Sequence, residues 1–411
     1  MMYIFLSENE LSMKDRIQRI LPSIILDVAL PSLDVYSDIS LIIGWLRWNP
    51  WGSREYNYGL MMIVPVLLQI LSSIYKWYQI DDPKTKKWSW ILVIFQCWPQ
   101  FRSLKVVRLL YKNDSRAEEE KKKMMRDVLS TEPYLEAWPS VMITTGIWMG
   151  ELIRFRRNEN DVFGELGSIK MGFYFSYSIS ILTASLGLTK LLLVGPCPIL
   201  SDKGLLNGLF TWRFFLCFLG VLSSMLTKAF FIVFAIGVVR ARDSESVAIS
   251  TIIGLSLLII PSLTLSTISI LGSTGFKFGK IIFEYPGLWL LSVATYYTVG
   301  PKNVQFCSLE RNIQRKKLGF SRKLSIINMI MTNFMFVVTF CFIVFYDIAE
   351  TGFKDGFFST LGHFFIWGFY TAPFLIFAFL FNMIFMALDL DCCCNRSQSC
   401  CPKFCCGPQC F

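Results

Sequence analysis

Three aspartates lie within one apolar stretch near the start of the chain, Leu21 to Trp45 (LPSIILDVALPSLDVYSDISLIIGW). At a helical rotation of about 100° per residue, Asp27, Asp34 and Asp38 fall within ~40° of one another on one face. An ionised side chain near the centre of a bilayer costs about 2.5–3.5 kcal/mol on insertion scales, so such residues face protein, water or a polar ligand. The pattern predicts a polar groove or an ion site. The alternative is that these carboxylates pair with buried Lys or Arg residues and only hold the helices together.

Three basic residues in later apolar stretches are candidate partners for these carboxylates. Lys228 lies deepest in its stretch (LSSMLTKAFFIVF), where snorkelling to the membrane interface explains it least well. Arg213 lies near the start of the same stretch and is more typical of an interface anchor. Lys190 is intermediate, and for this residue pairing with an aspartate and anchoring are equally open.

Glu132 and Glu136 are one helical turn apart and would share a face of the segment Leu129 to Gly150. Paired carboxylates are also used in acid–base catalysis. However, no nucleophile or metal-ligand spacing accompanies them, and His363 is the only histidine in the chain. We therefore expect no enzyme activity, no cofactor and no metal site.

Eight of the thirteen cysteines crowd into the last twenty residues. Metal binding, disulfides and S-palmitoylation are the three possible explanations. The cysteine pairs at 400–401 and 405–406 are too close together for a regular zinc knuckle, and a cytoplasmic tail is reducing. Palmitoylation beside the membrane is therefore favoured, and it would fix the tail to the inner leaflet. The candidate acylation sites are Cys392, Cys393, Cys394, Cys400 and Cys401.

The composition is that of a polytopic membrane protein. Hydrophobic residues make up 54% of the 411 residues and charged residues 17%, below the ~25% of soluble domains. The net charge of +10 does not indicate nucleic-acid binding, because the basic residues lie in short runs between apolar stretches, as expected of topology signals. The first residues lack the pattern of a cleaved signal peptide.

Eight stretches reach the ~20 residues that a helix needs to cross a bilayer. They are Leu21 to Trp45, Tyr58 to Ile80, Gly167 to Val194, Gly208 to Val239, Val247 to Leu271, Ile281 to Val299, Ile326 to Phe345 and Phe357 to Leu388. By the positive-inside rule, the basic residues before the first stretch and after the second place the N-terminus in the cytoplasm. The same rule returns the C-terminal tail to the cytoplasm.

Two further apolar segments, Trp88 to Phe101 and Leu129 to Gly150, have basic runs on both sides. Each must therefore enter and leave on the same side of the membrane, with breaks supplied by Pro99, Pro133 and Pro139. We expect an all-α bundle of about eight transmembrane helices plus two membrane-embedded half-segments. It forms one domain over residues 1–391, followed by the cysteine-rich tail 392–411.

Several motifs in this order resemble the XK-related family, which includes the XK blood-group protein and the apoptotic lipid scramblases. Asp34 and Asp38 (LDVYSDI) match the family's early Asp-x-x-x-Asp motif, and LLQILSSIYKW is similar to its polar-aromatic end of the second span. FQCWPQFRSLKVVRLLY is comparable with a short Gln-containing segment that leads to an Arg-Tyr-Leu-like sequence. The most specific match is YLEAWPSVM, which resembles Phe-Leu-Glu-Ala-x-Pro-Gln-Leu. Order and spacing agree from about Leu21 to Met149, as in a divergent member.

The resemblance implies passive, ATP-independent phospholipid scrambling in the plasma membrane, with head groups following charged residues inside the membrane. It assigns Asp34, Asp38 and Glu136 to this path. It leaves the basic partner of the path unmatched, and neither tail holds a convincing Asp-x-x-Asp caspase site. Two other functions stay open: a membrane subunit that holds a partner protein, and an ion-coupled solute carrier that uses the aspartates as a cation or proton site.

Overall fold

The computed structural model describes the greater part of the chain, and this part is all-helical. The described residues are 13–78, 83–95, 97–112, 114, 116–117, 120, 137–157, 171–193, 212–242, 247–274, 286–298, 320, 323–339, 341, 376, 380 and 382–383. Within these ranges there is no strand. The predicted all-α class is therefore confirmed.

Helices lie within the first seven predicted spans, because an apolar run that leaves water must satisfy its backbone groups internally. In the sixth, Ile281 to Val299, the described helix covers only Pro286–Ala294, which is too short to cross a bilayer. The eighth, Phe357 to Leu388, falls almost entirely outside the described residues. The elements are α1 (Met13–Ile24), the π-helical turn η1 (Ile25–Ala29), α2 (Leu30–Trp48), α3 (Arg54–Tyr78), α4 (Pro83–Ile94), α5 (Trp98–Tyr111), α7 (Trp138–Arg157), α8 (Met171–Leu193), α10 (Trp212–Arg242), α11 (Val247–Thr274), α13 (Pro286–Ala294) and the helix Lys323–Thr339.

Two stretches among the described helices are long and apolar enough to cross a membrane: Arg54–Tyr75 in α3 and Phe214–Ile232 in α10. They fit a membrane protein by length and composition. The count of eight spanning helices stays a prediction.

The two predicted half-segments have different outcomes. The first is broken, because α4 ends at Ile94 and a new helix, α5, begins at Trp98 with Pro99 in its first turn. In the second, Pro139 occupies the first turn of α7, where a missing N–H costs no helical hydrogen bond. Helix α7 then continues past the predicted end at Gly150 to Arg157, so this boundary was wrong. Residues 129–136 lie outside the described part of the chain.

Helices α1, η1 and α2 form one continuous helical segment whose winding changes before Pro31. Proline has no N–H to offer the carbonyl of Asp27, four residues back, and its ring crowds that carbonyl. The backbone is π-helical at this point, and the Leu30 N–H donates to the carbonyl five residues back. Because a π turn holds more residues than an α turn, the rotation between Asp27 and the pair Asp34 and Asp38 differs from that of a regular α-helix.

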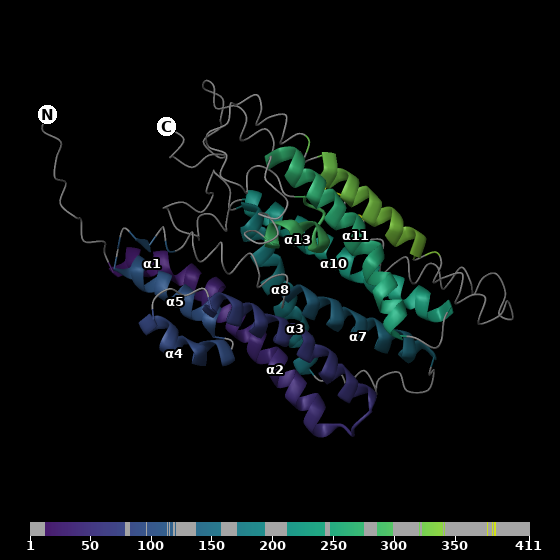
Figure 1. Cartoon of the computed structure of the whole chain (residues 1–411), viewed down its shortest axis with the longest axis horizontal. Coiled ribbons are helices and arrows are strands. Elements are labelled where there is room, and N and C mark those ends of the chain that lie inside the picture. The colour runs from purple at the N-terminus through teal and green to yellow at the C-terminus, as the bar shows by residue number, and fades with distance from the viewer. Residues whose placement is uncertain are drawn as a thin grey trace, which may run out of the picture.

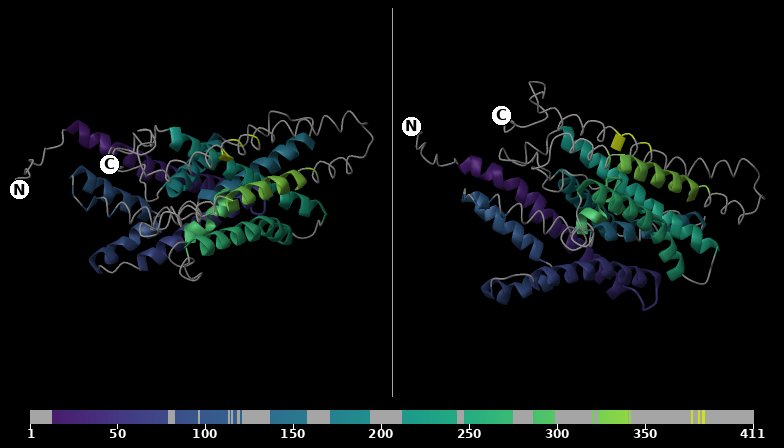
Figure 2. Two further views of the ribbon diagram at one scale, coloured as in Figure 1. Left: turned by 90° about the horizontal axis from the view of Figure 1, so that it is seen from above. Right: turned by 45° about the horizontal axis from the view of Figure 1, so that its top comes forward.

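The helices lie in two groups joined by α7 and α8 (Figure 1). On one side, α1 lies beside α5, and α2 pairs with α3 in a hairpin. On the other side, α10 packs against α11, and α13 packs against both of them. The helix Lys323–Thr339, drawn in yellow-green, lies along this second group (Figure 2). Helix α8 contacts both α2 and α10, so it connects the two groups.

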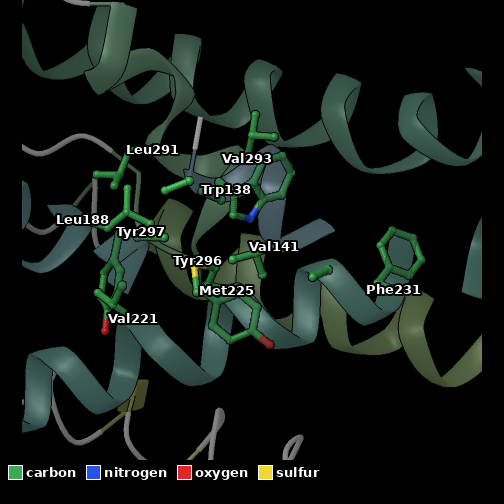
Figure 3. Packing of buried hydrophobic residues seen from close by; sticks show 14 of the residues in the cluster. Trp138, Val141, Leu188, Val221, Met225, Phe231, Leu291, Val293, Tyr296 and Tyr297 are labelled. Carbon is green, nitrogen blue, oxygen red and sulfur yellow. The ribbon is translucent and has the colours of Figure 1, made fainter. Parts of the chain in front are cut away.

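The main cluster of buried apolar side chains lies where α7, α8, α10 and α13 meet (Figure 3). Val141 of α7, Leu188 of α8, Met225 of α10 and Leu291 of α13 are all fully buried there. Each of these helices contributes a side chain from a different part of the sequence. The cluster therefore fixes α7 and α8 against the second group of helices.

Gly220 of α10 provides a test of this packing. A Cβ atom there would lie 2.9 Å from the Tyr297 hydroxyl and 3.1 Å from Asn382 Oδ1. Overpacking of this kind costs about 1–3 kcal/mol, so Gly220→Ala should lower the midpoint of thermal unfolding in detergent. Gly44→Ala on α2 is the control, because a Cβ at Gly44 meets nothing within 4 Å. It should leave the midpoint unchanged or raise it slightly. Equal midpoints for the two variants would contradict the close approach at Gly220.

Candidate functional site

Two carboxylates on α2 are buried and hydrogen-bonded by serine hydroxyls from two other helices. Asp34 is 2% exposed and Asp38 is 1% exposed. Ser140 of α7 donates to Asp38 Oδ2 at 2.8 Å, and Ser176 of α8 donates to Asp38 Oδ1. Ser180 of α8 donates to Asp34 Oδ1 at 2.6 Å. We call these five residues the aspartate–serine cluster.

The spacing of the residues explains how the cluster forms. Asp34 and Asp38 are four residues apart, so their side chains project from one face of α2. Ser176 and Ser180 have the same spacing on α8. Asp38 meets Ser176 and Asp34 meets Ser180, so the two helices run antiparallel and their faces match turn for turn. Small serine side chains allow the two backbones to approach closely.

The electrostatics of the cluster are those of carboxylates solvated by hydroxyl groups. Hydrogen bonds to an ionised acceptor are roughly twice as strong as neutral ones, and a buried carboxylate that loses a donor is costly. Among the described residues, the partners of Asp38 are hydroxyls and no basic side chain forms an ion pair with it. Asp38 therefore keeps acceptor capacity that a cationic or hydroxyl-bearing group can use.

Gln69 of α3 adds a polar group that lies level with the cluster. The rings of Trp45 and Tyr58 are 5.9 Å apart and fix the register of the α2–α3 hairpin. Asp34 and Gln69 each lie eleven residues from this pair along their own helices, which places them at the same height. Gln69 is 3% exposed, and neither amide atom has a hydrogen-bond partner among the described residues.

Thr183 extends the polar face along α8. It follows Ser176 and Ser180 at helical spacing, so the three hydroxyls share one side of the helix. The Thr183 hydroxyl is buried and has no hydrogen-bond partner within the described ranges. A buried polar group without a partner costs about 1–3 kcal/mol. Gln69 and Thr183 therefore mark positions on α3 and α8 where a polar ligand or water would be stabilised.

Asp27 lies on a different element from the other two aspartates. Asp27 is half-buried on η1, which packs against α1, α2 and α5. The serines that contact Asp34 and Asp38 come from α7 and α8 instead. The π-helical turn before Pro31 changes the rotation between Asp27 and the other two aspartates. The assignment of Asp27 to the same polar face stays a prediction.

Lys228 is fully buried, but it does not neutralise the aspartates. Its ammonium contacts the Ser262 hydroxyl, the Asn328 side-chain oxygen and the Ser292 carbonyl. These residues belong to α11, the helix Lys323–Thr339 and α13, respectively. Lys228 was expected to be the counter-charge of the aspartates. Among the described residues it contacts only neutral oxygens, because helix packing directs its side chain towards the second group of helices.

The remaining predicted site residues are not placed by the structure. Lys190 lies on α8 and Arg213 on α10, but the described part of the chain does not include their side chains. Glu132 and Glu136 lie outside the described residues, as do all five candidate acylation sites, which are Cys392, Cys393, Cys394, Cys400 and Cys401. Their proposed roles stay predictions.

The sequence interpretation missed the serines and Gln69. The serine spacing in SYSIS carries a signal, because two small polar residues four apart in an apolar helix are typical of close helix–helix contacts. Gln69 also stands out as an amide in an apolar stretch (LLQIL). The sequence does not predict the partners of the serines, because these contacts join positions more than one hundred residues apart.

Removal of a hydroxyl from the cluster should destabilise the protein. Ser176→Ala takes a charge-assisted hydrogen bond from Asp38 and should cost about 1.5–3 kcal/mol, measured as a lower midpoint in thermal or denaturant unfolding. Ser32→Ala is the matched control. Ser32 is exposed on α2 and its hydroxyl only donates to the Val28 carbonyl of its own helix, so the change should be within about 0.5 kcal/mol. If both variants unfold alike, the carboxylate contact contributes nothing.

Comparisons with known proteins do not assign the chain to a family. No model of a known protein family matches it, and no curated protein is significantly similar to it. The functional interpretation therefore depends on the geometry of the aspartate–serine cluster and on the motifs around it.

Proposed function

We propose that the protein is a passive phospholipid scramblase. Head groups would pass along the aspartate–serine cluster between α2, α7 and α8, while the acyl chains stay in the bilayer. The observation that carries the proposal is the pair of almost fully buried carboxylates, Asp34 and Asp38, in a lining of serine hydroxyls. The proposal places this process in the plasma membrane. It places both termini in the cytoplasm, an orientation that the distribution of basic residues supports.

The chemistry of the lining suits a zwitterionic or anionic head group. A head group that crosses hydrocarbon loses its hydration, and buried polar groups must replace it. The carboxylates of Asp34 and Asp38 attract the ammonium of a head group. Serine and threonine hydroxyls both donate and accept hydrogen bonds, so they can solvate the phosphate as well as the amine.

The buried polar groups without partners support a transient ligand more than a permanent structural role. If the cluster only held helices together, selection for stability would favour partners for Gln69 and Thr183, or apolar replacements. Instead, the Gln69 amide and the Thr183 hydroxyl are buried on α3 and α8 with unused hydrogen-bonding capacity among the described residues. A passing head group would use this capacity and then release it. No step in the process requires a nucleotide.

An ion-coupled solute carrier is the second candidate function. Two carboxylates one turn apart, held in place by hydroxyls, also suit a cation or proton site within a membrane. The two functions differ in what moves. A carrier needs an ion gradient to drive uptake of a solute, whereas a scramblase equilibrates lipids without a gradient or ATP.

The central test measures lipid movement in liposomes that contain the purified protein and fluorescent phospholipids. Asp34→Asn and Asp38→Asn should each slow scrambling by about tenfold or more, the effect of ~1.4 kcal/mol on the barrier. Glu55→Gln is the control, since Glu55 is a partly exposed carboxylate that pairs with Arg54 near the α2–α3 turn. Folded wild-type protein that moves no lipid would contradict the proposal. Gradient-driven solute uptake would favour the carrier.

Gln69→Leu separates function from stability. Leucine has a similar volume and removes a buried amide that has no hydrogen-bond partner in the described structure. The variant should therefore be as stable as the wild type or more stable, by about 1 kcal/mol. If the amide solvates head groups, the same variant should scramble lipids more slowly. Unchanged scrambling in a stabilised Gln69→Leu protein would exclude Gln69 from the path.

A further inference from the structure

A second buried polar centre surrounds Lys228, in the group of helices on the far side of α7 and α8 from α2 (Figure 1). The Lys228 side chain is fully buried in the middle of α10. Its ammonium donates to Ser262 Oγ at 3.1 Å and to Asn328 Oδ1 at 3.4 Å, and it also donates to the Ser292 carbonyl oxygen. We call Lys228, Ser262, Ser292 and Asn328 the lysine cluster.

The cluster is built around the end of a helix inside the protein. Helix α13 ends at Ala294, yet the non-helical residues 295–298 are also buried. The last carbonyls of a helix have no partners within it, and they form the negative end of the helix dipole. Among apolar helices these oxygens need donors or cations. The α13 end therefore requires positive charge or N–H groups from neighbouring helices.

Asn328 supplies N–H donors to the carbonyls at this helix end, and Lys228 supplies the positive charge. The Asn328 amide nitrogen donates to the carbonyls of Ser292, Thr295 and Tyr296 at 3.2–3.3 Å. Its side-chain oxygen is left to accept from the Lys228 ammonium, and it also accepts from the Ser262 hydroxyl at 3.3 Å. The ammonium is therefore the positive charge that faces the end of α13.

The ligands of the ammonium have a distinctive chemistry. They are a backbone carbonyl, a hydroxyl and an amide oxygen, all of them neutral, and no carboxylate among the described residues pairs with Lys228. Neutral oxygens at the C-terminal end of an interrupted membrane helix are the groups that coordinate Na⁺ in transporters. A carbonyl-rich cage also replaces the hydration shell of K⁺ in channels.

We propose that the lysine cluster is a monovalent cation site whose resident cation is the Lys228 ammonium. The tethered ammonium satisfies the three oxygens without an ion from solution. A variant that removes the ammonium and leaves its space open would then take up Na⁺ or K⁺. The inference does not rest on the proposed function, since none of the residues of the aspartate–serine cluster takes part.

The test compares two variants of the full-length protein in detergent. Lys228→Ala removes the charge and opens space for an ion, whereas Lys228→Met removes the charge and fills the space with an apolar chain of similar length. Thermal unfolding is followed in N-methylglucamine chloride and in Li⁺, Na⁺, K⁺, Rb⁺ or NH₄⁺ chloride, all at the same ionic strength. Binding of radioactive Rb⁺ to each protein provides a readout that is independent of stability.

The expected result is a response confined to Lys228→Ala. At about 200 mM of the best-fitting alkali cation, its midpoint should rise by about 2–4 °C relative to N-methylglucamine, as expected for a ligand that binds only the folded state. Wild type should not respond, because the ammonium occupies the site, and Lys228→Met should not respond, because the methionine fills it. Rb⁺ binding should likewise exceed that of the wild type only in Lys228→Ala.

Several outcomes would overturn the proposal. One is a folded Lys228→Ala protein whose midpoint is the same in alkali chlorides and in N-methylglucamine. Another is an equal response of Lys228→Met, which would show a general salt effect. Rescue by NH₄⁺ alone would show that the oxygens require N–H donors and do not coordinate an alkali cation. Lys228→Ala protein that fails to fold in every salt would show that a free cation cannot replace the ammonium.

Discussion

The burial of Asp34 and Asp38 is the constraint on which the arrangement of the helices depends. A carboxylate in an apolar interior is tolerated only with hydrogen-bond donors close by. Here the donors are Ser140 of α7 and Ser176 and Ser180 of α8. Helix α2 must therefore lie against both α7 and α8 in one register, because a shift by one residue would turn the carboxylates away from the serines. Helix α3 follows through its short hairpin connection to α2.

The protein has two charged centres of opposite sign that do not neutralise each other. The aspartates are solvated by hydroxyls on one side of α7 and α8, and the Lys228 ammonium is solvated by neutral oxygens on the other side. The same helices α7, α8, α10 and α13 that carry polar residues of the two centres also form the main apolar cluster. The Lys228 ammonium and the Asp38 carboxylate are each held by neutral groups among the described residues. The two centres therefore act as separate functional candidates.

The comparison of sequence and structure shows which features local patterns can predict. Apolar runs of spanning length predicted the helices, since each run has to form its own backbone hydrogen bonds. The four-residue spacing of Asp34 and Asp38 also predicted a shared face. Pro31 predicted a local disturbance of the helix. The sequence does not show whether the backbone forms a kink or a π turn there, and this choice determines the direction in which Asp27 is rotated. The partner of Lys228 could not be predicted, because Ser262 and Asn328 reach it only through packing of separate helices.

The contact between Asp38 and Ser176 also bears on how the chain is made. The two residues are 138 positions apart, which at about 5–20 residues per second corresponds to roughly 7–28 s of translation. During this interval α2 has left the ribosome while its serine partners on α8 have not been synthesised. Helix α2 is therefore complete for many seconds before the α8 serines that solvate its carboxylates exist.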